Sequence, residues 1–98
     1  RKAGDSMAMN YSLYEEKTEL LKVLAHPVRL CIVKNLLEKG ATNVSKMQNC
    51  LNVPQSTISQ HLQKLRTAGI VDGVRRGVEI TYSVKDERVK PLLKILFC

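Results

Sequence analysis

Apolar residues recur at helical spacing along most of the chain and alternate with polar residues in one segment, which predicts a mainly α-helical domain with a small β-hairpin. The first such segment predicts a helix over Leu13 to Ala25. Ser12 is its expected N-cap, and Glu15 three residues later completes a capping box. His26-Pro27 ends this helix because the residue before a proline avoids the helical backbone conformation.

The next two segments predict a longer helix and a short one. Pro27 opens a helix that runs to about Lys39 and is closed by Gly40. Its expected buried residues are Val28, Cys31, Ile32, Val33 and Leu36. Asn43 or Thr42 then caps a short third helix, whose expected core residues are Val44, Met47, Cys50 and Leu51.

A fourth helix follows after a tight turn at Asn52 and Val53. It opens at Pro54 and Gln55 and is closed by Gly69, with Val53, Ile58, Leu62 and Leu65 as its apolar positions. A short helix, a tight turn and a second helix form the helix-turn-helix pattern.

Two alternating segments come next, Ile70 to Arg75 and Val78 to Val84, around a basic turn at Arg76-Gly77. A hairpin directly after the second helix of the pair makes the predicted fold a winged helix-turn-helix, in the order α-α-α-α-β-β-α.

The last helix carries an apolar stripe at Val89, Leu92, Leu93 and Leu96, with Asp86 as its candidate cap. Pro91 falls inside this segment, so we expect an irregular start or one near 87–90. Ile95 and Phe97 make the helix apolar on a second side as well, which is more than one small core can bury. We interpret this helix as part of a dimer interface.

Composition limits the class of protein. A chain of 98 residues with 44% hydrophobic residues and a mean hydropathy of -0.16 fits one folded domain, which we place at residues 11–98. Residues 1–10 lack periodicity and an apolar leader core, so they are interpreted as a flexible tail or a cloning remnant. No apolar run approaches the roughly 20 residues that cross a bilayer, so we expect no membrane partner and a cytoplasmic location.

Charge and cysteine content add to this picture. A net charge of +7 and a pI of about 9.6 suit a polyanionic partner, nucleic acid first. Three cysteines without short paired spacing argue against both a disulfide scaffold and a CxxC zinc site.

Three stretches resemble the ArsR/SmtB family of winged-helix repressors. They are LAHPVRLCIV (24–33), QSTISQHLQKLRTAGIV (55–71) and the hairpin RRGVEITYSV (75–84). The resemblance covers about Leu20 to Leu96 without large gaps, and generic helix-turn-helix proteins do not share all three segments. It implies a sequence-specific repressor that binds an inverted-repeat operator in double-stranded DNA.

The resemblance also implies site residues. The family forms homodimers through its first and last helices, and the corresponding residues here are Leu13, Tyr14, Leu21, Leu92, Leu93 and Leu96. The fourth helix enters the major groove, where short amides and hydroxyls suit base edges; these are Gln55, Ser56, Thr57, Ser59 and Gln60. Candidate contacts to the DNA backbone are Ser45, Lys46, His61, Lys64, Arg75 and Arg76. Arg29, near a helix start, is interpreted as structural.

The family's metal sites are not matched. Asn43-Val44-Ser45 stand where one site has a Cys-x-Cys, and neither end residue replaces a thiolate ligand. At the second site Asp86 matches, but Arg88 replaces a histidine, and zinc needs about four ligands. We therefore expect no metal and no other cofactor, as in the family's metal-independent members.

A thiol switch stays open as an alternative form of regulation. Some family members sense oxidants with one cysteine on the second helix and one on the last, and this chain has Cys31 and Cys98 there. Each lies about one helical turn earlier than in those members, and a disulfide needs Cα atoms within about 7 Å. The other interpretation is that Cys31 packs in the core and Cys98 is an incidental thiol.

Other function classes fit less well. An RNA-binding module usually stacks bases on clustered aromatic residues, and the few aromatics here do not gather on the expected binding face. Cys50 and His61 flank the turn before the fourth helix, but no activating third group accompanies them, so we predict no enzyme. A further role in binding another protein stays open.

Overall fold

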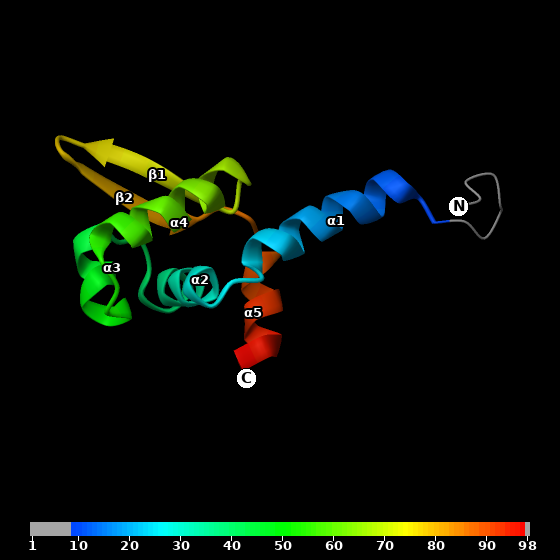
Figure 1. The fold of residues 1–98 in the computed structure, drawn as a ribbon, viewed down its shortest axis with the longest axis horizontal. Helices are drawn as coiled ribbons and strands as arrows, with labels where there is room; N and C mark the ends of the chain where they lie inside the picture. The colour runs from blue at the N-terminus through cyan, green and yellow to red at the C-terminus, as the bar shows by residue number, and fades with distance from the viewer. Residues whose placement is uncertain (1–8, 98) are drawn as a thin grey trace.

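The computed structural model describes residues 9–97, except for the side chains of Asn49 and Cys50. Its elements are α1 (Tyr11–Leu24), α2 (Pro27–Lys39), α3 (Val44–Leu51), α4 (Gln55–Thr67), β1 (Val71–Arg76), β2 (Glu79–Val84) and α5 (Val89–Phe97). The predicted winged helix-turn-helix order is therefore confirmed. Figure 1 shows α2, α3 and α4 gathered beside the β1–β2 hairpin, while α1 extends away from them and α5 runs down beside α2.

The start of α1 differs from the prediction. Asn10, not Ser12, is the N-cap, and its Oδ1 accepts a hydrogen bond from the backbone N–H of Leu13 at 3.2 Å. Ser12 lies inside the helix, so the expected Ser12–Glu15 capping box is wrong. Asparagine caps as well as serine does, and this cap lets the helix start two residues earlier, at Tyr11. Of the residues assigned to the tail, 1–8 lie outside the described residues.

The face of α2 that packs into the core also differs in one residue. Ile32, Val33 and Leu36 are buried as expected, but Cys31 is exposed. A helix turns by about 100° per residue, so Cys31 points almost opposite to this buried face. The interpretation of Cys31 as a core residue is therefore wrong, and the same interpretation of Cys50 concerns a side chain outside the described part of the chain.

The helix-turn-helix unit is formed by α3 and α4. Asn43 caps α3, accepting the N–H of Lys46 at 2.9 Å, and Asn52 ends it in the left-handed conformation with φ 58°. At the end of α4, Gly69 adopts φ 78°, which a residue without a side chain does at little cost. The N–H groups of Gly69 and Ile70 then bond to the carbonyls of Arg66 and Leu65, respectively, as in a Schellman motif.

The wing is a two-stranded antiparallel hairpin. Its register pairs Val71 with Val84 and Arg76 with Glu79, so the turn lies at Gly77 and Val78, one residue later than predicted. Val78 is accordingly no strand residue. The structure adds a pairing that periodicity did not indicate: Thr42, between α2 and α3, exchanges two backbone hydrogen bonds with Tyr82 of β2 at 3.0 and 2.7 Å.

The hydrophobic core draws on every element. Its buried members are Leu24, Ile32, Val33, Leu36, Met47, Ile58, Leu62, Leu65, Ile70, Val71, Tyr82, Val89 and Leu93. Leu93 is only 3% exposed, so it packs into the core of the single chain and leaves almost no surface for the dimer contact assigned to it. No helix within residues 9–97 is long and apolar enough to cross a membrane.

The start of the C-terminal helix, expected near 87–90 because of Pro91, is confirmed. α5 begins at Val89, which places Pro91 in the first turn, where a missing N–H breaks no helical hydrogen bond. Asp86 receives the N–H of Arg88 at 2.9 Å and the Arg88 guanidinium at 2.6 Å. The Asp86 carboxylate therefore orders the segment that enters α5.

We predict that Leu65→Ala lowers the free energy of unfolding by about 2 to 5 kcal/mol, because it leaves a cavity beneath α4. Urea unfolding followed by circular dichroism at one fixed protein concentration measures the change. Val78→Ala at the exposed turn is the matched control and should stay within about 0.5 kcal/mol of the wild type. Equal losses for the two variants would contradict the position of Leu65 in the core.

Candidate DNA-binding surface

One face of α4 is buried in the core and the other is exposed to solvent. Ile58, Leu62 and Leu65 are fully buried, which fixes the rotation of the helix about its axis. The polar residues between them therefore face outward: Gln55, Ser56, Ser59 and Gln60 are exposed, and Thr57 is half-buried. All five residues predicted to read bases thus lie at the N-terminal half of one helix, next to the turn.

A side-chain contact links this face to α3. Gln55 Nε2 donates a hydrogen bond to Ser45 Oγ at 2.9 Å. One amide hydrogen is used in this way, while the amide oxygen and the second hydrogen stay available for a base edge. Ser45, predicted to contact phosphate, is thus placed to orient Gln55, and Lys46 beside it is exposed.

His61, predicted to contact the DNA backbone, is half-buried on α4 and also contacts α2 and the α1–α2 junction. Its Nδ1 accepts a hydrogen bond from Arg29 Nε at 3.1 Å, and its ring lies 4.4 Å from the ring of His26, centroid to centroid. Desolvation by burial is the main cause that lowers the pKa of His61 below its usual value of 6.5. The nearby positive charges, including that of Lys64, lower this pKa further. Arg29 is structural, as the sequence indicated.

The wing carries the basic residues that the sequence assigned to it. Arg75 and Arg76 are exposed near the tip, and Arg75 Nη1 donates to the carbonyl of Gly77 at 3.3 Å. Val78 at the turn is 95% exposed. The tip is therefore a cationic loop of small cross-section, which suits phosphates or a minor groove.

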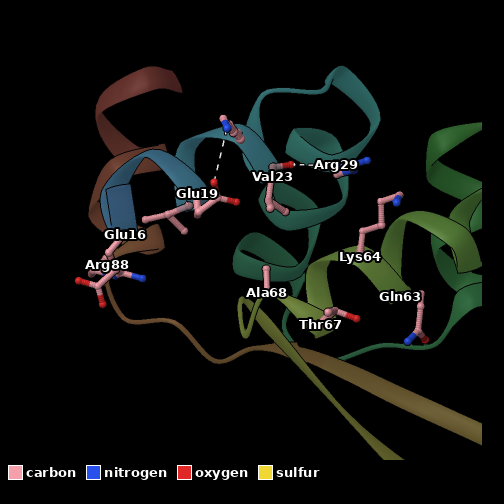
Figure 2. A pocket seen from close by; sticks show the side chains of 11 residues that line it. Glu16, Glu19, Val23, Arg29, Gln63, Lys64, Thr67, Ala68 and Arg88 are labelled. Carbon is pink, nitrogen blue, oxygen red and sulfur yellow. Dashed lines mark hydrogen bonds and ion pairs between the residues drawn. The ribbon is translucent and has the colours of Figure 1, made fainter. Parts of the chain in front are cut away.

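An open groove of about 830 Å³ lies between α1 and the C-terminal half of α4. Figure 2 shows Glu16 and Glu19 on the α1 wall and Gln63, Lys64 and Thr67 on the α4 wall. Its other charged residues are Lys22, Arg29 and Arg88. Cations thus outnumber carboxylates in the groove, and Lys64 continues the exposed face of α4 along its edge.

The residues of the proposed dimer interface are mostly exposed. Leu13, Tyr14 and Leu21 on α1 and Leu96 on α5 are each about half exposed or more, and Leu92 is half-buried. These are large apolar side chains that the single chain leaves in contact with solvent.

The family's metal sites and the thiol switch have little support among the described residues. Within the described residues, no group of three or more His, Cys, Asp or Glu side chains is gathered in metal-binding distance, and Arg88 occupies the Asp86 carboxylate. Cys31 is exposed, but Cys98 lies outside the described residues. Their pairing therefore stays a prediction.

Together the helix-turn-helix, its exposed polar face and the basic wing define a winged-helix DNA-binding protein. A family model described as a helix-turn-helix domain matches residues 24–74. The transcriptional repressor PagR of Bacillus anthracis is 42% identical over 90% of this chain and 88% of its own. The crystal structure of PagR superimposes with a TM-score of 0.80, covering 89% of this chain and 99% of that one.

Two further relatives extend the comparison. The repressor SmtB of Mycobacterium tuberculosis H37Rv is 44% identical over 72% of this chain and 52% of its own. HlyU from Vibrio cholerae is 30% identical with a TM-score of 0.81, over 90% of this chain and 94% of that one. The chain belongs to the ArsR/SmtB family of winged helix-turn-helix transcriptional repressors. None of these relatives is named as an enzyme.

We predict that Gln60→Ala lowers affinity for a preferred DNA sequence by about 1 to 3 kcal/mol and hardly changes affinity for random DNA, because it removes a base contact. Arg76→Ala should weaken both alike and reduce the salt slope by about 1, because it removes a phosphate contact. Anisotropy titrations on a duplex that the protein selects from a random library, and on a scrambled duplex, measure both effects. Equal losses on the two duplexes for Gln60→Ala would remove that residue from base readout.

Proposed function

We propose that this protein is a homodimeric repressor that occupies an imperfect inverted-repeat operator overlapping a promoter. The observation that carries this proposal is the exposed face of α4, where amides and hydroxyls stand at the N-terminal end of a helix whose other side is buried. The N-terminal part of a recognition helix is the part that reaches base edges in the major groove. The relatives named as transcriptional repressors support the same role.

Each contact class has its own residues in this proposal. Gln55, Ser56, Thr57, Ser59 and Gln60 read bases. Lys46, Lys64, Arg75 and Arg76 bind phosphates or the adjacent minor groove, with the net charge of +7 supplying the sequence-independent attraction. Ser45 acts by holding Gln55.

The dimer is proposed from the apolar surface of α1 and α5. Leu24 is the only buried residue of α1, while Leu13, Tyr14 and Leu21 are exposed on a helix that extends away from the core (Figure 1). Leu96 adds the same kind of surface on α5. Large exposed apolar side chains gathered on two helices are typical of an interaction surface. A second copy of the chain covers them in this proposal, and the two-fold axis places two α4 helices on half-sites about one helical turn apart.

No metal and no cofactor enter the proposed mechanism. The chain represses transcription by occupying the operator. It acts in the cytoplasm, where the DNA is. The folded domain from residue 11 onward takes part in binding.

We predict that Leu21→Glu combined with Leu96→Glu yields a folded monomer with strongly reduced operator affinity, because a buried unpaired charge is incompatible with the interface. Sedimentation velocity measures the oligomeric state, and anisotropy measures the affinity. Val78→Glu is the matched control: it puts the same charge on an exposed apolar residue of the wing and should leave the dimer intact. A double variant that still sediments as a dimer would contradict the proposed interface.

The function itself is tested by selection and footprinting. We expect the protein to enrich an inverted repeat from a random duplex library and to protect it from cleavage. Its affinity should fall steeply with salt, because lysine and arginine contacts release counterions from DNA. A structured RNA of equal length is the competitor. A complex that is insensitive to salt, or one that RNA displaces better than random DNA, would contradict the proposal.

A further inference from the structure

One arginine connects the helix proposed for dimerisation to the recognition helix. Arg29, in the first turn of α2, donates from Nη1 to the carbonyl of Val23 and from Nε to Nδ1 of His61, both at 3.1 Å. Val23 lies in the last turn of α1, where carbonyl groups have no partner within the helix. Figure 2 shows Arg29 reaching Val23 beside the groove, with Lys64 on the neighbouring helix. The guanidinium of Arg29 thus donates to a carbonyl at the end of α1 and, with the same planar group, to His61 on α4.

We propose that Arg29 and His61 are positioning residues for operator recognition, which set the placement of α4 relative to α1 and work only while His61 is neutral. This inference rests on the proposed function, because the spacing of two α4 helices matters only if a dimer binds DNA with them. It also changes the role of His61. The residue supports the recognition helix from behind and does not contact phosphate.

The protonation state follows from the geometry. Nδ1 of His61 accepts the Arg29 hydrogen bond, so the neutral ring carries its proton on Nε2. A second proton would have to bind at Nδ1, directly facing the Arg29 N–H, and the hydrogen bond would be lost. The guanidinium cannot adapt by losing its own proton.

The elements packed around His61 present cations and another imidazole to its ring. From α2 it faces the Arg29 cation, from the α1–α2 junction the ring of His26, and from α4 itself Lys64. His26 is held by its own contact, since its Nδ1 accepts the N–H of Val28 at 3.1 Å. The carboxylates of the groove, Glu16 and Glu19, lie on the opposite wall on α1 (Figure 2).

Protonation of His61 opposes its hydrogen bond from Arg29, so this contact is sensitive to pH. Burial and these cations lower the pKa of His61 while it accepts the Arg29 hydrogen bond. The ring therefore binds a proton more readily once it has left this site. The hydrogen bond is fully present above the usual pKa of 6.5 and is weakened as the pH falls from 6.5 through the lowered pKa of the packed ring. Operator binding should weaken in mild acid. A histidine that contacted phosphate would give the opposite sign, since its imidazolium would bind DNA more tightly.

The experiment measures affinity for the selected duplex and for a scrambled one between about pH 7.5 and pH 5.5, where histidine titrates. For the wild type we expect about a five- to tenfold loss on the selected duplex at the acidic end, the size of one hydrogen bond per protomer, and no loss on the scrambled duplex. Circular dichroism and sedimentation at each pH establish that the chain stays folded and dimeric.

Variants distinguish a role of His61 and Arg29 in placing α4 for DNA recognition from a role in stability alone. His61→Leu removes the acceptor and should lower the selected-duplex affinity at every pH. His61→Asn places an oxygen near the position of Nδ1, so it should restore most of that affinity and abolish its pH dependence. Arg29→Lys keeps the charge but cannot donate to two sites in one plane, so it should resemble His61→Leu. His26→Asn is the matched control: asparagine keeps the N-cap of α2, and the pH dependence should persist.

Three results would overturn the proposal. The first is tighter binding of the selected duplex by the wild type in acid, and the second is a pH dependence that His61→Asn leaves unchanged. The third is independent of DNA: imidazole nitrogen NMR should show the Nε2-protonated form of His61 at neutral pH, and the Nδ1-protonated form would exclude the hydrogen bond from Arg29. Failure to select any duplex, with the expected NMR result, would instead refute the proposed function and with it the role of Arg29 in recognition.

Discussion

Burial of three residues on one side of α4 is the constraint on which the DNA-binding surface depends. Ile58, Leu62 and Leu65 are completely removed from solvent, and each such side chain contributes about 1.5 to 3 kcal/mol relative to an exposed one. A rotation of the helix by one residue would expose them. The short amides and hydroxyls therefore face outward, because the core permits no other orientation of the helix. Their identity is not constrained by packing and can be set by the surface that they contact.

The wing and the recognition helix are held as one body by backbone pairing. Thr42 joins β2 at Tyr82, so the loop before α3 becomes an additional edge of the hairpin. The Schellman end of α4 leads directly into β1 through Gly69. A DNA-binding surface formed by a helix and a wing needs this rigidity, because contacts to DNA lose their specificity when their spacing varies.

The two ends of α1 differ in their exposure to solvent. Near its N-terminal end it presents the half-exposed apolar side chains of Leu13 and Tyr14, and toward Leu24 it enters the core. Arg29 binds at that second end and reaches across to α4. One side chain therefore links the end of α1 to α4 through the imidazole of His61.

The sequence by itself determined what depends on local spacing. The order of helices, the wing and the buried face of α4 follow from periodicity and from residues such as Pro27 and Gly69, whose backbone preferences are intrinsic. The outward-facing polar residues of α4 follow from the same periodicity. Only the tertiary structure decided where Cys31 points and that Leu93 belongs to the core, because these depend on which side of a helix meets its neighbours. The contact of His61 with a residue on another helix is likewise a product of packing, and no local pattern encodes it.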